Sequence, residues 1–133
     1  MKKRIALITA GITLAVSGVA QAHGLGIAIA EISKTSSNTI ERAGEYRIPS
    51  VHNKVSVRTC TWYRPSGGSW GALLNTCETK TLEKQNRVRD VSGWSFEDSW
   101  CNGHLKTRAR GWATGDSGTE HSEDTDESNP VAC

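Results

Sequence analysis

The chain has 133 residues and a formal net charge of +2, and 36% of its residues are hydrophobic. This length supplies one hydrophobic core and excludes a second domain of ordinary size. No run approaches the roughly 20 apolar residues that a membrane-spanning helix needs. The sequence therefore predicts one small domain without a transmembrane segment.

The first 22 residues have the three regions of a secretory signal peptide. Three basic residues follow Met1, residues 5–19 form an uncharged apolar run, and residues 20–22 read Ala-Gln-Ala, a small-x-small cleavage site. We therefore expect an exported protein whose mature chain begins at His23. Removal of 22 of the 133 residues leaves 111.

Charge is unevenly distributed along the expected mature chain. The leader takes three of the 16 basic residues, which leaves 13 against 14 acidic residues and a net charge of −1. Residues 113–133 hold six carboxylates and no Lys or Arg, so a body of +5 carries a tail of −6. This balance disfavours nucleic acid as the partner, because phosphate binding needs a clear excess of basic groups.

Four cysteines follow the leader: Cys60, Cys77, Cys101 and Cys133. An even number in a small exported domain indicates two disulfides, for which three pairings are possible. A zinc site is disfavoured because no two cysteines have C-x-x-C spacing and no two histidines lie three to five residues apart.

Strands are favoured over helices because no long stretch has apolar residues at helical spacing. The expected strands are, in chain order, Leu25–Ile32, Gly44–Ile48, Lys54–Tyr63, Thr76–Glu83, Asn86–Val91, Leu105–Thr114 and Thr119–Glu127. Turn-forming residues separate them, among them Pro49 and the Pro65–Gly68 segment. The predicted fold is all-β: a small antiparallel β-sandwich or barrel stapled by two disulfides.

The first cysteine pair follows from strand pairing. If the chain turns back between Arg64 and Gly71 so that paired residue numbers sum to 137, Cys60 stands opposite Cys77. A disulfide between them would clamp the hairpin.

The second pair, Cys101 with Cys133, follows if the chain turns at Gly115–Gly118 so that the numbers of paired residues sum to 234. That register also pairs opposite charges, Arg108 with Asp126 and Arg110 with Asp124. The returning strand has no apolar residue between Gly118 and Val131, so we expect it at an edge of the sheet.

Aromatic and basic side chains gather around the turn of the first hairpin. Trp62, Tyr63, Arg64 and Trp70 bracket the Pro65–Gly68 segment. Such groups are typical of binding hot spots. The alternative is that these tryptophans fill the core, since the mature chain has one Phe and few Leu.

This disulfide-clamped hairpin with its Trp-Tyr-Arg triplet resembles the proteinaceous α-amylase inhibitors of the tendamistat type over residues 60–133. Those inhibitors present an aromatic and arginine triplet between two sequential disulfides, so the resemblance implies an inhibitor. Their triplet runs Trp-Arg-Tyr, whereas here the order differs and the triplet almost directly follows the first cysteine. The cysteine spacing is also similar to that of subtilisin-inhibitor-like proteins, without their reactive-site sequence.

Residues 115–118 read Gly-Asp-Ser-Gly, which matches the segment around the nucleophile of chymotrypsin-like proteases. A nucleophilic serine needs a histidine base oriented by a carboxylate. His52 and His104 lack that family's surrounding motif, and the expected mature chain is too short for two barrels. We interpret the segment as a turn.

Two metal hypotheses are weaker still. An N-terminal His23 can chelate copper if His52, His104 or His121 supplies a second imidazole. Residues 124–129 place oxygen ligands at alternate positions as a calcium loop does, but the glycine and the bidentate glutamate of that loop are missing.

The function favoured by the sequence is a secreted, non-enzymatic binding protein, an inhibitor or toxin-like effector that acts on an extracellular protein or envelope component. Trp62, Tyr63, Arg64 and Trp70 are its predicted contact residues, and no cofactor is expected. One alternative is a secreted antibacterial protein that acts on a competitor's envelope. Another is a small copper-binding protein that uses His23, or a small hydrolytic enzyme. The target and the oligomeric state stay open.

Overall fold

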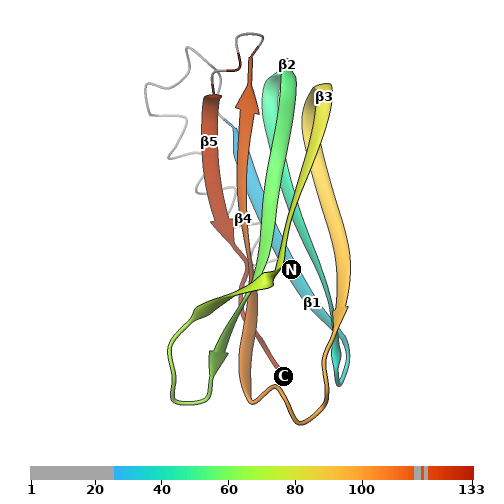
Figure 1. Cartoon of the computed structure of the whole chain (residues 1–133), viewed down its shortest axis with the longest axis vertical. Coiled ribbons are helices and arrows are strands. Elements are labelled where there is room, and N and C mark those ends of the chain that lie inside the picture. Colours follow the sequence, from blue (N-terminus) through green and yellow to red (C-terminus); the bar gives the residue numbers. More distant parts are fainter. Residues whose placement is uncertain (1–25, 116–117, 119) are drawn as a thin grey trace.

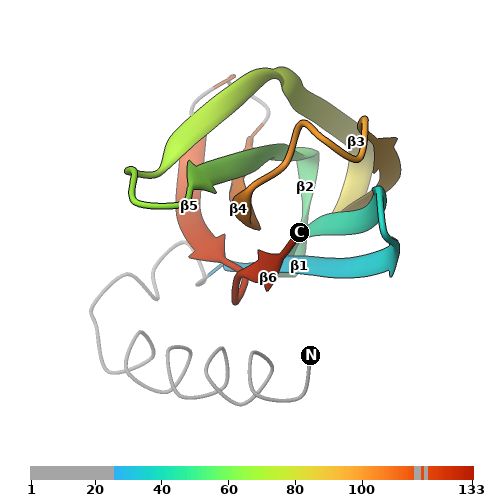
Figure 2. The ribbon, with the colours of Figure 1, turned by 90° about the horizontal axis from the view of Figure 1, so that it is seen from below.

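The computed structural model describes residues 26–115, 118 and 120–133, which form one antiparallel sheet of six strands without a helix (Figure 1). The expected leader and His23 lie outside these residues. The strands are β1 (Ile27–Ser36), β2 (Thr39–Pro65), β3 (Gly71–Ser95), β4 (Gly103–Thr114), β5 (Glu120–Glu127) and β6 (Val131–Ala132). Seen from below, the sheet curls into a half-barrel that brings β5 beside β1 (Figure 2).

β2 and β3 each run the length of the molecule twice, because both strands fold over at the same end (Figure 1). Residues 39–47 of β2 pair with β1, residues 54–65 pair with β4, and β3 follows both arms. Strand pairing is interrupted near Pro49, which has no N–H to donate. Lys84 takes a positive φ of 55° in β3 at this corner. The strands predicted on either side of Pro49 are therefore the two arms of one bent strand.

The inner face of the half-barrel holds two apolar clusters. One is centred on Tyr46 and includes Ala28, Ala30, Ile48, Val55, Val57, Val88, Ala109 and Ala113. A Cβ atom at Gly111 would lie 2.2 Å from the Tyr46 ring, so only glycine lets β4 pass this close. The other cluster contains Ile32, Ile40, Cys101 and Leu105, with Tyr63, Leu73, Trp94, Phe96, Val131 and Cys133 packed against it.

Both predicted disulfides are present, Cys60–Cys77 and Cys101–Cys133. The hairpin that contains the first has the predicted register up to Thr59, where Arg58 stands opposite Thr79, but beyond it the pairing shifts by three residues. The all-β antiparallel fold with these two disulfides is thus confirmed.

The predicted register of the second hairpin is wrong by one residue. Arg108 of β4 pairs with Glu127 rather than Asp126, and Arg110 no longer stands opposite Asp124. A shift of one residue turns every side chain of a strand to the other face of the sheet. Asp124 and Asp126 therefore point away from the arginines, toward the opposite face of the sheet.

The aspartates of β5 join this strand to β1. Asp124 Oδ2 accepts a hydrogen bond from the Ala28 amide at 2.9 Å, and Asp126 Oδ2 accepts one from the Ala30 amide at 2.8 Å. Ser128 Oγ accepts from a β4 amide at 2.8 Å. The alternating oxygens that resemble the start of a calcium loop thus bind backbone amides, which is the physical reason for the shifted register.

Candidate functional site

The outward side chains of β2 and β4 lie side by side and form one surface. In β4 the buried residues alternate with more exposed ones, so the even-numbered side chains point away from the core. The second arm of β2 alternates in the same way from Arg58 to Trp62. We define the β2–β4 face by Arg58, Cys60, Trp62, Arg64, Lys106, Arg108, Arg110 and Trp112, together with the neighbouring Trp70.

Each tryptophan of this face is covered by a cation. Distances to the ring centroids are 4.6 Å for Arg110 over Trp112, 5.4 Å for Arg108 over Trp62, 4.4 Å for Lys106 over Trp70 and 5.0 Å for Arg64 over Trp70. Such contacts contribute about 0.5–1 kcal/mol each at exposed sites. They also restrict the charged groups, which reduces the entropy that a ligand contact would otherwise cost.

A groove of about 210 Å³ lies on the β2–β4 face. Three guanidinium groups, the indole of Trp62 and the aliphatic side chains of Ala72 and Leu74 line it, with Cys60 and Thr125. No carboxylate is among these lining residues. Leu74 is 72% exposed.

Surrounding carboxylates balance the charge of two of the three groove arginines but not of the third. Arg58 stands directly opposite Arg110, and like charges in this position repel. Arg110 Nε donates to Glu123, and Arg108 Nε lies 3.8 Å from Glu127 Oε2. Within the described part of the chain, Arg58 has no carboxylate partner. The excess charge is therefore centred on Arg58.

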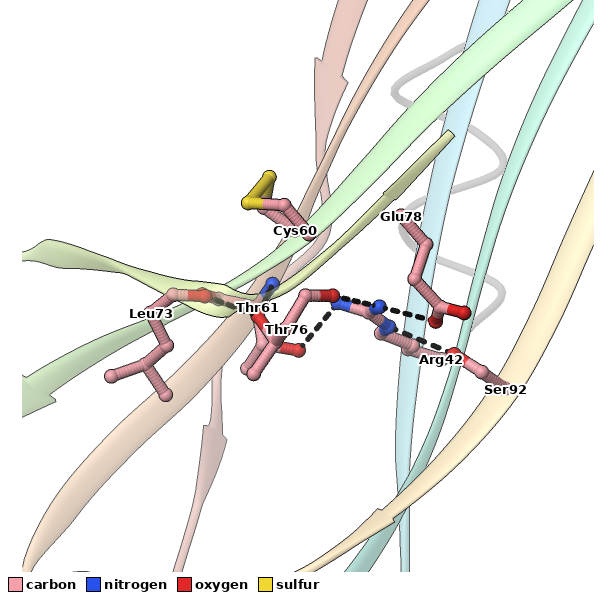
Figure 3. Close-up of polar contacts among 8 residues, drawn as sticks. Arg42, Cys60, Thr61, Leu73, Thr76, Glu78 and Ser92 are labelled. Atoms are coloured by element: carbon pink, nitrogen blue, oxygen red, sulfur yellow. Dashed lines mark hydrogen bonds and ion pairs between the residues drawn. A yellow bond between two sulfur atoms is a disulfide. The ribbon is translucent and has the colours of Figure 1, made fainter. Parts of the chain in front are cut away.

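Arg42 fixes the strands behind the Cys60–Cys77 disulfide (Figure 3). This buried guanidinium comes from the first arm of β2 and donates to Thr61 Oγ1 on the second arm at 2.9 Å. It also donates to Ser92 Oγ at 3.0 Å, to Glu78 Oε1 at 2.9 Å and to the Thr76 carbonyl. A buried charge is stable only with such partners, so Arg42 ties both arms of β2 to β3.

A bulge in β3 shapes one wall of the groove. The pairing of β2 with β3 shifts after Thr59, so that Thr61 stands opposite Leu73. Thr76 holds the extra residues in place: its Oγ1 accepts from the Thr61 amide at 2.9 Å and donates to the Leu73 carbonyl at 2.6 Å. As a result, Ala72 stands opposite Trp62.

Three of the four predicted contact residues lie together on the β2–β4 face: Trp62, Arg64 and Trp70. The two tryptophans are partly buried and belong to neither apolar cluster. Tyr63 points to the other side of the sheet, where its ring centroid is 4.7 Å from that of Trp100 and its Oη accepts from the Asn102 amide at 3.1 Å. Tyr63 therefore packs against the second apolar cluster.

Sequence reasoning missed five residues of the face: Arg58, Lys106, Arg108, Arg110 and Trp112. A signal was present, because basic and aromatic residues occupy every second position from Lys106 to Trp112. That period is typical of one face of a strand. The prediction instead assigned these cations to pairing with the acidic segment.

Another arginine cluster surrounds Glu45 on the first arm of β2. The carboxylate of Glu45 is 1% exposed and accepts from Arg89 Nη1 at 2.9 Å, while Arg87 Nε lies 3.0 Å away and Arg47 also donates. Burial raises the pKa of Glu45, but the hydrogen bonds from Arg47 and Arg89 and the positive charges of Arg47 and Arg87 outweigh it, so the pKa lies below its ordinary value. The hydrogen bond to Glu31, at 2.9 Å, raises the pKa of Arg89.

The remaining sequence motifs are placed as follows. Gly118 N donates to the Gly115 carbonyl at 3.0 Å, which closes a turn, while Asp116 and Ser117 lie outside the described residues. In the described ranges, no group of three or more His, Cys, Asp or Glu residues is arranged to hold a metal ion. His23 and the side chain of His121 are not among the groups described. Within these same limits, no helix is long and apolar enough to cross a membrane.

Neither a protein-family model nor a curated protein matches the chain. Among solved structures, the chain is similar to the X-ray structure of Northeast Structural Genomics Consortium target SoR45, with 12% sequence identity and a TM-score of 0.35. The similarity covers 86% of this chain and 90% of that chain. At this level it carries no argument about function.

Proposed function

We propose that this chain is an exported, non-enzymatic protein that binds an extracellular macromolecule through the β2–β4 face, as an inhibitor or toxin-like effector does. One observation carries the proposal: three arginines and an indole surround a groove that no carboxylate lines. Tryptophan and arginine are the residue types most enriched among binding hot spots.

The fold gains nothing from placing the charge of Arg58 opposite that of Arg110. A carboxylate at position 58 would attract Arg110 across the strands, whereas Arg58 repels it. Departures from local rules that have no structural compensation are expected at functional sites. An anionic group brought by a partner would remove the repulsion, which explains why the arginine is present.

Export is supported by two independent features. The first 22 residues have the composition of a signal peptide, and the mature part contains two disulfides and no free cysteine in its described residues. Disulfides persist in oxidising compartments outside the cytosol. The partner is accordingly expected in the periplasm, the envelope or the medium.

Retention of a partner on the immobilised mature protein tests the proposal. Culture supernatant and envelope fractions are passed over the wild type, Trp62→Ala, Trp70→Ala and Arg58→Gln, with Lys34→Gln as the matched control because exposed Lys34 lies on β1, away from the face. We expect the wild type and the control to retain the same component. The tryptophan variants should bind it about 30-fold more weakly, the lower limit of a hot spot, with nearly unchanged melting temperatures.

Two results would contradict the proposal. One is retention that does not differ between the wild type and the variants of Trp62 and Arg58. The other is a large loss of stability in Trp62→Ala, on the scale of about 3–5 kcal/mol seen when core aromatic residues are truncated. The latter result would assign Trp62 to packing rather than to binding.

A further inference from the structure

We infer that the groove binds an extended acidic peptide segment whose carboxylates occur at alternate residues. This inference rests on the proposed function and specifies its partner. Two features of the molecule support it: a second arginine block in which the chain supplies its own carboxylate, and the spacing of the arginines along β4.

The second arginine block is the cluster on the first arm of β2. Glu45 and Arg47 stand on β2 opposite Arg89 and Arg87 on β3. These four residues form a two-by-two block on one face of the sheet, in which three guanidiniums surround one carboxylate. Arg87 Nε and Arg89 Nη1 lie within 3.0 Å of its oxygens. The block shows that a single carboxylate can engage three arginines in this arrangement.

The groove contains a related block of three arginines. Arg58 and Cys60 stand on β2 opposite Arg110 and Arg108 on β4, so three arginines again occupy three of four adjacent positions. The fourth position is Cys60, whose side chain is held in a disulfide and carries no charge, and it lies at the other end of its β2 pair from Glu45. A carboxylate from a partner would therefore meet three adjacent guanidinium groups, the same number that surrounds Glu45.

The spacing of the arginines along β4 shows which kind of polyanion fits. Glu123 and Glu127, four residues apart on β5, contact Arg110 and Arg108 from one side of this row of arginines. Outward residues of an extended chain recur about every 6.8 Å, which is also the spacing of the arginines along β4. A second extended chain with carboxylates at every second residue matches this row, whereas the anionic groups of glycans and nucleic acids follow the spacing of their sugars.

The apolar side of the groove favours a peptide as well. Leu74 is 72% exposed and lies with Ala72 beside the arginines. These side chains offer contact area for the methylene groups of glutamate side chains and for intervening residues.

Calorimetric titration with a blocked decapeptide of alternating Glu and Thr tests the inference. The control peptide has the same composition with all Glu residues in one block, and a heparin hexasaccharide and a single-stranded oligonucleotide represent the other polyanions. We expect the wild type and Lys34→Gln to bind the alternating peptide at least about tenfold more tightly than the block peptide and the other two polyanions. Arg58→Gln should weaken that binding at least about tenfold, the loss expected for a charge-assisted hydrogen bond.

A second variant supplies the carboxylate from within the chain. Thr125 is exposed on β5, lines the groove and stands opposite Arg110. Thr125→Glu should therefore compete with the peptide and weaken its binding at least about tenfold without removing any cation. Unchanged peptide binding in a folded Thr125→Glu protein would overturn the inference.

Other results separate the inference from the proposed function. Equal affinity for the two peptides, tighter binding of the glycan or the oligonucleotide, or no peptide binding at about 1 mM would overturn the acidic-peptide inference. The proposed function would stand in each case if partner retention still depended on Arg58 and Trp62. It would fall only if retention were independent of both.

Discussion

The two arginine clusters of β2 share a strand arrangement and differ in what lies at their centre. Around Glu45 the chain supplies a carboxylate that is 1% exposed, and the cluster links β1, β2 and β3 through Glu31 and Arg89. In the groove the fourth position is Cys60, Arg108 and Arg110 are paired with Glu127 and Glu123 of β5, and Arg58 has no carboxylate partner among the described residues. The comparison teaches that an arginine stabilises the fold where the chain provides its anion and is available to a ligand where it does not.

The largest loss of stability is expected from replacing Arg42, which supports the groove and belongs to neither arginine cluster. Arg42→Leu leaves the Thr61 hydroxyl and the Thr76 carbonyl without their buried donor. Each unsatisfied group costs about 1–3 kcal/mol, so we expect the free energy of unfolding to fall by about 3 kcal/mol. Urea denaturation measures it, and a loss below about 1 kcal/mol would show that Arg42 does not tie the two arms of β2 together.

The carboxylate of Glu45, at the centre of its arginine cluster, should be required for stability. Glu45→Gln retains the shape of the side chain but removes the charge that holds Arg47, Arg87 and Arg89. Hydrogen bonds to charged groups contribute about 1.5–3 kcal/mol, and we expect a destabilisation of about 2–3 kcal/mol in urea at neutral pH. A variant as stable as the wild type would show that this cluster has no structural role, and the comparison of the two clusters would lose its basis.

The same carboxylate predicts a dependence of stability on pH. The pKa of Glu45 is lower in the folded state than in the unfolded chain, so its contribution is complete above the unfolded value of about 4.3. That contribution should disappear as the pH falls below about 4.3 and through the lower folded value. Denaturation between neutral and acidic pH should show a smaller loss of stability for Glu45→Gln than for the wild type. Parallel pH profiles for the two proteins would contradict the assignment.

The first hairpin could be predicted from the sequence, and the second could not, for a physical reason. Cys60 and Cys77 lie in adjacent strands of one hairpin, so the pairing that joins them also sets the register around Arg58. Cys133 follows β6, which is separated from β5 by residues 128–130, so the second disulfide does not fix how β5 pairs. The register of β5 depends on amides of β1, which lie 96 residues away in the sequence.

The candidate site, too, could be predicted from the sequence only in part. Trp62, Arg64 and Trp70 could be identified because they flank a recognisable turn. The cations of β4 could not, since β2 and β4 pair without a connecting turn and about two fifths of the chain separates Arg58 from Arg110. Long-range pairing of this kind leaves only the alternation of residue types as a signal within each strand.

Supplying a carboxylate to the arginines of the groove should make them resemble the cluster around Glu45. Thr125→Glu places an acidic group opposite Arg110, and a favourable cross-strand charge pair contributes about 0.2–1 kcal/mol. We expect a gain of that size in the free energy of unfolding, measured in urea at low salt. Thr125→Gln is the matched control, because it has the same length without the charge and should show no gain. A destabilised Thr125→Glu would indicate that the groove has no excess of positive charge.

The most direct test compares the unfolding free energies of Arg58→Gln and Arg87→Gln, each of which removes one arginine from one of the two clusters. Arg87 contacts a buried carboxylate at 3.0 Å, so its loss should cost about 1 kcal/mol. Arg58 faces Arg110 across the strands, so its loss should cost nothing or add up to about 0.5 kcal/mol of stability. If Arg58→Gln is destabilised as much as Arg87→Gln, the groove arginines serve the fold, and the claim that they await an anionic partner is contradicted.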